Sequence, residues 1–236
     1  MAKLWAKTLC TCANASGAAV AAREGRVVMI VDVVDMSTTA EAALEAGVRL
    51  VLGASPDHAE PPVDVNPKKI GYLAGCKASE YRCEIVVAGE PRLPTAEGAE
   101  RRRQSMGKVL EGIDRAGAGV EKIVPNLGRE VADLVDFKDK ILLIVSSSGG
   151  TAFDAAFNSG APAVVTGTVA RTAGMSGNKP ARAAAARVIR IAAEHRCGIA
   201  LVAASSNSLE DLLAVDYIEK MIIDFGFLSR NSGNGQ

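Results

Sequence analysis

Two carboxylates and two hydroxyls at the start of a predicted helix are the strongest candidates for chemistry in this sequence. Asp32 interrupts the most apolar segment, Val27–Val34, and Asp35 follows it, with Ser37 and Thr38 close behind. Mg²⁺ prefers carboxylates together with substrate oxygens, and N–H groups at a helix N-terminus favour anions. Simple helix capping would explain the hydroxyls. It leaves Asp32 among valines unexplained, because an isolated buried carboxylate is costly.

A second segment, Ser146–Gly150, reads Ser-Ser-Ser-Gly-Gly and lies between a predicted strand, Lys140–Val145, and a predicted helix, Thr151–Asn158. Glycines let backbone N–H groups approach an oxyanion closely, and hydroxyls add further donors. The turn is neither a Walker A loop nor a G-x-G-x-x-G fingerprint. Anion binding and plain helix capping both stay open as interpretations.

Two further polar segments follow predicted strands. Ser208-Leu209-Glu210-Asp211 opens the last predicted helix, where acidic residues can be dipole partners, metal ligands or a general base. The loop from Gly167 to Lys179 carries Arg171 and Lys179, which could bind an anion. As single residues, each of the two cations is also compatible with an ordinary surface charge.

The elements that must position these residues alternate regularly along the chain. Apolar runs such as Ile199–Ala203 are typical of strands buried on both faces, and helical stretches separate them. This alternation predicts a single three-layer α/β/α sandwich with a mainly parallel sheet. We expect one domain over residues 1–228 and a flexible tail over 229–236. Ligands of such folds bind outside the carboxyl ends of the strands.

Two helices carry more specific predictions. The spacing of Thr38 and Glu41 predicts a capping box at a helix that ends near Gly47. The residues from Ala96 to Ala116 predict one continuous helix with a charged face.

Composition excludes several classes of protein. Lys+Arg and Asp+Glu are both 27, so the basic excess of most nucleic-acid-binding domains is absent. No apolar run approaches the ~20 residues of a membrane span, and the N-terminus lacks the features of a signal peptide. The sequence therefore predicts a cytoplasmic protein. Its five cysteines and two histidines show no disulfide framework and no zinc-ligand spacing.

One segment carries a family resemblance. Residues 28–47, VMIVDVVDMSTTAEAALEAG, resemble the opening motif of the 2-phosphosulfolactate phosphatase family. In that motif a strand ends in Asp-Val-Leu-Arg, and a run of small residues and Thr leads to a helix that ends in Ala-x-Gly. The matching residues are Asp32, Val33, Ser37, Thr38 and Gly47.

Two later segments continue the resemblance, which spans roughly residues 26–224. Ser146–Thr151 is similar to the family's Thr-Thr-Asn-Gly-Thr turn, with Gly149 as the clearest match. Ser208–Asp211 matches a Ser-x-Glu-Asp motif near the family's C-terminus.

The resemblance implies a three-layer α/β/α sandwich and Mg²⁺-dependent hydrolysis of a phosphate ester on a sulfonated lactate in coenzyme M biosynthesis. It assigns Asp32, Glu210 and Asp211 to the metal and to water activation. The turn and the Gly167 loop would contact the anions of the substrate. We therefore predict a Mg²⁺-dependent phosphatase for a small sulfonated or carboxylated acid.

The predicted site residues fall into three groups. The catalytic residues are Asp32, Asp35 and Glu210, and the metal ligands are Asp32, Glu210 and Asp211. The substrate-binding residues are Ser37, Thr38, Ser146, Ser147, Ser148, Gly149, Gly150, Arg171 and Lys179.

Two departures from the family keep other functions open. Asp35 stands where the family has Arg, and Ser148 stands where it has Asn. The chain could catalyse another step on a small sulfonate, such as an elimination or a sulfur insertion that uses Cys10 and Cys12. It could also be a non-catalytic binding subunit, and its small apolar helix faces suit a homo-oligomer.

Overall fold

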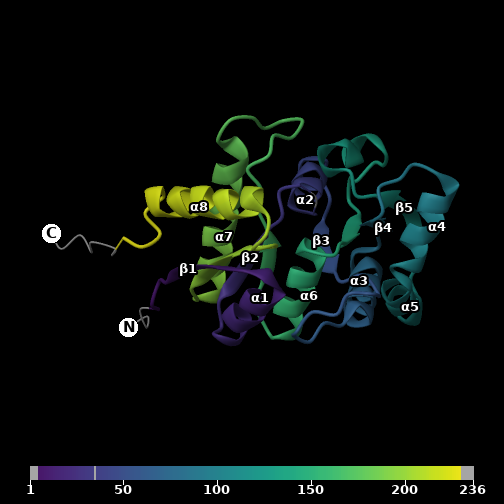
Figure 1. Cartoon of the computed structure of the whole chain (residues 1–236), viewed down its shortest axis with the longest axis horizontal. Coiled ribbons are helices and arrows are strands. Elements are labelled where there is room, and N and C mark those ends of the chain that lie inside the picture. Colours follow the sequence, from purple (N-terminus) through teal and green to yellow (C-terminus); the bar gives the residue numbers. More distant parts are fainter. Residues whose placement is uncertain (1–4, 35, 230–236) are drawn as a thin grey trace.

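The computed structural model describes residues 5–34 and 36–229, and it confirms an α/β fold in which helices cover parallel sheets (Figure 1). The described strands form two four-stranded, all-parallel sheets rather than the single sheet we predicted. The first has the order β1 (Leu9–Ala13), β8 (Ile199–Ala203), β2 (Val27–Val31), β7 (Val164–Thr166). The second has the order β3 (Leu50–Ala54), β6 (Ile141–Val145), β4 (Ile85–Gly89), β5 (Val120–Pro125).

The helices alternate with these strands along the chain. They are α1 (Asn14–Arg23), α2 (Met36–Glu45), α3 (Pro67–Tyr81), α4 (Ala96–Gln104), α5 (Gly107–Arg115), α6 (Gly149–Asn158), α7 (Lys179–His195), α8 (Leu209–Asp224) and the 3₁₀ helix η1 (Gly128–Asp133). Helices α7 and α8 lie at the end of the molecule opposite to α3, α4 and α5 (Figure 1). Within the described residues, no helix is both long and apolar enough to cross a membrane.

The split between the sheets lies between their edge strands β7 and β3. Both strands line a cavity of about 180 Å³, together with the side chains of Phe153 and Arg187. Side chains rather than a backbone ladder therefore fill the space between these two strands.

Alternate residues of β2 pack into two separate clusters, as a strand buried on both faces requires. Val28 and Ile30 belong to a cluster shared with α1 and α6. Val27, Met29 and Val31 belong to another, shared with α7 and α8. The middle strands of the first sheet thus form the central layer between two helical layers, which confirms the predicted three-layer arrangement.

Some local predictions were wrong. The helix predicted from Ala96 to Ala116 is divided into α4 and α5, because the chain turns at Ser105 and Met106. The Ser105 hydroxyl donates to the carbonyl of Glu90 at 3.1 Å, and the Met106 side chain is fully buried. Elements β1 and α1 were not predicted at all.

The predicted capping box was also wrong. Helix α2 begins at Met36, so Thr38 and Glu41 both lie inside it. The Thr38 hydroxyl donates to the carbonyl of Val33 at 2.5 Å, and Glu41 forms an ion pair of 2.6 Å with Arg187 of α7.

A buried carboxylate in α6 anchors the proline-rich loop over residues 55–66. Asp154 is fully buried and accepts hydrogen bonds from the hydroxyl of Ser55 at 2.9 Å and the backbone N–H of Asn66 at 2.7 Å. It also accepts one from the amide of Asn158 at 2.6 Å. Because Asp154 binds both ends of this loop, it fixes the wall that the loop supplies to the site described below.

The predicted domain boundary, after residue 228, lies at the end of the described residues. Apart from Ser229, the predicted tail over 229–236 lies outside the described residues. The assignment of residues 1–228 to one domain stays a prediction.

Candidate functional site

The carboxylate of Asp32 lies where the carboxyl ends of the two sheets meet. Asp32 follows β2, and its side chain is only 3% exposed. Its Oδ2 accepts a hydrogen bond from the hydroxyl of Ser148 at 2.8 Å and another from the backbone N–H of Gly149 at 2.8 Å. Ser148 and Gly149 follow β6 of the other sheet, so the structure brings the first two predicted segments together.

The close approach of these segments requires a glycine. A Cβ atom at residue 149 would lie 2.5 Å from Oδ2 of Asp32 and 2.9 Å from the Cβ atoms of Asp32 and Met36. Such distances are shorter than non-bonded contacts allow. We predicted that this glycine lets the backbone approach an anion, and the anion that it approaches is the protein's own carboxylate.

Two other hydroxyls of this region, those of Ser37 and Ser146, have partners within the protein. The Ser37 hydroxyl donates to the carbonyl of Ile30 at 3.0 Å and accepts from the backbone N–H of Asp32 at 3.0 Å. The Ser146 hydroxyl accepts from the backbone N–H of Gly150 at 2.8 Å. These contacts, like that of Thr38, stabilise the turns after β2 and β6, and substrate binding by these groups stays a prediction.

The two acidic residues at the start of α8 differ in their surroundings. Asp211 is 3% exposed, and its Oδ1 accepts a hydrogen bond of 2.8 Å from the backbone N–H of Val33, directly after Asp32. The Ser208 hydroxyl caps α8 by accepting a hydrogen bond from the backbone N–H of Asp211 at 3.2 Å. Glu210 is exposed.

Two other predicted site residues, Arg171 and Lys179, are not brought to Asp32. Arg171 and Lys179 are exposed, and in the described ranges no hydrogen bond or ion pair joins them to Asp32 or Ser148. The charge of Arg171 instead helps to lower the pKa of Glu130 in η1. Asp35 lies outside the described residues, so its catalytic role stays a prediction.

Glu90 is a site residue that the sequence analysis missed. It follows β4 and is half-buried, and the backbone N–H of Ser147 faces its carboxyl group. The signal was present in the sequence, because Glu90 comes directly after an apolar run and therefore at the carboxyl end of a strand.

Burial is the main factor that raises the pKa values of three carboxyl groups at this edge: Asp32, Glu90 and Asp211. The charge of Asp32 raises the pKa of Glu90 and of Asp211 further. The guanidinium of Arg92 and the hydrogen bonds to Oδ2 act in the opposite direction on the pKa of Asp32. The site therefore combines carboxyl groups that hold their protons more strongly than exposed ones.

A cavity of about 730 Å³ opens beside one of these carboxylates, Glu90. Its lining includes Glu90 and Ser147 together with three basic side chains, His58, Arg92 and Arg101. The Nη2 of Arg92 donates to the carbonyl of Val34 at 3.1 Å, which holds the guanidinium over the turn after β2. Arginine is the side chain best suited to oxyanions, so this cavity can accept a small anion next to Glu90.

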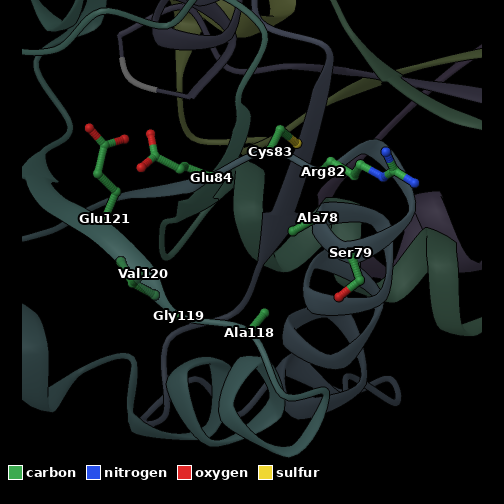
Figure 2. Close-up of a pocket in the computed structure, with 9 residues that line it drawn as sticks. All are labelled: Ala78, Ser79, Arg82, Cys83, Glu84, Ala118, Gly119, Val120 and Glu121. Carbon is green, nitrogen blue, oxygen red and sulfur yellow. The ribbon is translucent and has the colours of Figure 1, made fainter.

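A separate cavity of about 520 Å³ lies at the opposite, amino edge of β4 and β5 (Figure 2). Figure 2 shows Arg82 and Cys83 on one side of it and Glu84 and Glu121 on the other. Lys140 forms ion pairs with both glutamates, at 3.2 and 2.5 Å. No predicted site residue lines this cavity, and we place the site at the carboxyl edge.

The predicted Mg²⁺ ligands, Asp32, Glu210 and Asp211, do not form a three-ligand cluster. Across residues 5–34 and 36–229, no group of three His, Cys, Asp or Glu side chains could hold a metal ion. Oδ2 of Asp32 and Oδ1 of Asp211 already accept hydrogen bonds from the protein. This ligand set does not fit Mg²⁺ in the described structure. The Mg²⁺ requirement stays a prediction.

No family of known proteins matches the chain, and no curated protein matches it. The resemblance to the 2-phosphosulfolactate phosphatase family therefore rests on the sequence motifs alone.

Gly149→Ala is expected to destabilise the protein by about 1–3 kcal/mol, because its methyl group would overlap the Asp32 carboxylate. Urea denaturation followed by circular dichroism measures this change. Gly119→Ala is the matched control. A Cβ at residue 119 meets no atom within 4 Å, and the change should stay within about 0.5 kcal/mol. Equal stability of the two variants would contradict the predicted overlap.

Asp32→Asn is expected to raise the melting temperature at pH 8 by a few degrees, although it removes a candidate catalytic group. Burial raises the pKa of Asp32, so the folded state favours the neutral form, which asparagine resembles. The wild type has this stabilisation fully below the unfolded-state pKa and loses it as the pH rises through the folded-state pKa. The advantage of the variant should therefore vanish near pH 4.

Thermal denaturation over this pH range measures the effect. A variant that melts below the wild type at pH 8 would mean that the ionised carboxylate is mainly a structural partner of Ser148 and Gly149.

Proposed function

We propose that this chain hydrolyses a phosphate ester of a small sulfonated or carboxylated acid. The observation that carries the proposal is the cavity of about 730 Å³, in which basic side chains lie beside Glu90 at the end of the parallel strand β4. Phosphoryl transfer depends mostly on positioning and on stabilisation of the phosphoryl oxygens. The resemblance to the 2-phosphosulfolactate phosphatase family is the second support, and it suggests the sulfonated substrate.

The basic side chains of the cavity bind the anionic groups of the substrate in this proposal. Arg92 and Arg101 are suited to phosphate, sulfonate or carboxylate oxygens, and His58 adds a third donor. We assign anion binding to these side chains rather than to Arg171 and Lys179, because neither Arg171 nor Lys179 lines the cavity.

Arg92 also addresses the largest departure from the family. The family has an arginine where this chain has Asp35. Arg92 comes from the loop after β4, yet it contacts the carbonyl of Val34 in the turn that precedes residue 35. We infer that Arg92 supplies from another loop the positive charge that the family motif carries at that position.

Asp32 activates the attacking water in this proposal. Its carboxylate, held by Ser148 and Gly149, takes a proton from the water whose oxygen attacks phosphorus. A raised pKa makes Asp32 a stronger base than an exposed aspartate, and proton transfer of this kind contributes about 10²- to 10⁴-fold to a rate.

Phosphate release from 2-phosphosulfolactate and related phosphate esters, with and without Mg²⁺, tests the function. We expect Asp32→Ala to lower kcat by at least about 100-fold. Arg92→Ala should lower kcat/KM by about 10- to 100-fold, the effect of losing a hydrogen bond to a charged group. Arg103→Ala is the matched control, because Arg103 is exposed near Arg101 but does not line the cavity. No release above background from any ester, under either condition, would overturn the proposal.

A second candidate, sulfur insertion through Cys10 and Cys12, has less support. Both residues line a cavity of about 490 Å³ next to α1, with Glu24 and Arg26. Burial raises the pKa of Cys10, and it raises that of Cys12 to about 11. The thiolate is the reactive form of cysteine, so both side chains are poor nucleophiles at neutral pH.

Alkylation of the native protein with iodoacetamide at pH 7.5 tests this candidate. Cys76 is exposed and should react as an ordinary thiol, which makes it the internal control. Cys10 and Cys12 should react at least about 10-fold more slowly, as mass spectrometry of peptides would show. Reaction of either at the rate of Cys76 would restore the sulfur-carrier hypothesis.

A cytoplasmic location and a homo-oligomeric state complete the proposal. Several large apolar side chains are exposed on α8, and they support a subunit interface there: Leu209, Leu212, Leu213, Tyr217 and Ile223.

A further inference from the structure

Glu90 lies between the cavity and a buried polar cluster. It follows β4, its carboxyl group is half-buried, and it lines the cavity together with Arg92 and Ser147. The backbone N–H of Ser147 and the amide of Asn126 both face this carboxyl group. Glu90 thus lines the cavity where we place the substrate, while Ser147 and Asn126 contact its carboxyl group from the protein side.

Asn126 is an unusual neighbour because half of its amide has no partner. Asn126 follows β5, is fully buried, and donates its backbone N–H to the carbonyl of Gly89 at 2.9 Å. Its Oδ1 accepts a hydrogen bond of 2.6 Å from the hydroxyl of Thr39 in α2. Its Nδ2 has no hydrogen-bond partner among the described residues. A buried donor without an acceptor is costly, and such groups in native proteins call for an explanation.

The position of Asn126 supplies that explanation. The bond from Thr39 fixes Oδ1, so Nδ2 must lie on the opposite side of the amide. On that side the amide faces the Glu90 carboxyl group and lowers its pKa, although the two groups do not have the geometry of a hydrogen bond.

We propose that Glu90 is the catalytic residue that gives a proton to the leaving group, and that Asn126 is the positioning residue that holds its carboxyl group. This inference rests on the proposed phosphatase function. The bond between phosphorus and the ester oxygen breaks as the water oxygen bonds to phosphorus. The proton of Glu90 moves to the ester oxygen, which leaves as an alcohol. The water loses one proton to Asp32, after which Asp32 releases a proton to solvent and Glu90 regains one.

The charged groups around Glu90 agree with this role. Burial and the carboxylate of Asp32 raise the pKa of Glu90, whereas Ser147, Asn126 and His58 lower it less. Arg92 and Arg101 line the same cavity. Two carboxyl groups that interact in this way divide naturally into an acid and a base. Glu210, the glutamate that we predicted from the sequence, is exposed at the start of α8 and lacks these surroundings.

Glu90→Gln tests the proton donor, because glutamine keeps the size of the side chain but has no proton to transfer. With an alkyl phosphate ester we expect kcat to fall by about 100-fold or more and KM to change less than about threefold. With 4-nitrophenyl phosphate, whose leaving group needs no protonation, the loss should be below about fivefold. Glu84→Gln is the control at the opposite end of β4 (Figure 2) and should stay within about twofold of the wild type.

Equal losses with the two esters, or an alkyl-ester kcat near that of the wild type, would overturn the role of Glu90 and leave the phosphatase function intact. Absence of phosphate release by the wild-type protein would overturn the function itself, and with it the catalytic role of Glu90.

Asn126→Ala and Thr39→Val test the positioning role by a measurement that needs no activity. Removal of the amide donor, or of the hydroxyl that orients it, should raise the pH at which Glu90 titrates. Carboxyl ¹³C NMR of the full chain measures this pH. Thr39→Ser keeps the hydroxyl and should titrate like the wild type, while Thr39→Val serves if Asn126→Ala does not fold. An unchanged Glu90 titration in the folded Asn126→Ala or Thr39→Val variant would overturn the role of Asn126.

Discussion

The hydrogen bonds from Ser148 and Gly149 to Asp32 are the constraint on which the rest of the site depends. They connect the end of β2 in one sheet with the start of α6 after β6 in the other. The edge strands β7 and β3 do not pair, and side chains lie between them. The Asp32 carboxylate is therefore one of the polar contacts that connect the two sheets at their carboxyl edge. A buried carboxylate is tolerated only with such donors, and the donors need glycine at residue 149.

This arrangement also determines the electrostatics of the site. Because the Asp32 charge is buried and fixed, it raises the pKa values of Glu90, after β4, and of Asp211, in the first turn of α8. The guanidinium of Arg92 acts on Asp32 from the loop after β4. Acidic and basic groups therefore meet beside one cavity, and a small anion can be bound there next to groups that transfer protons.

The residues that the sequence predicted correctly are those whose role follows from local pattern. Asp32 was expected to be buried at the end of a strand, and it is. Gly149 was expected to let the backbone approach an anion of the substrate, and in the structure it approaches the carboxylate of Asp32. Glu210 and Asp211 looked equivalent in the sequence, yet only Asp211 is buried against the turn after β2, where it binds Val33. Which of two neighbouring residues faces the core depends on how α8 packs, and this is not encoded in their types.

The alternation of apolar runs and helical stretches determined by itself the α/β class, the parallel strands and the edge at which polar residues gather. These features follow from the period of the side chains and from the cost of leaving backbone groups unpaired. Tertiary structure alone decided that Glu90, Asn126 and Arg92 lie near Asp32, since these residues come from segments about 60 to 90 positions away. It also decided that β7 and β3 do not pair. Contacts between distant segments depend on the packing of whole layers, which no local pattern specifies.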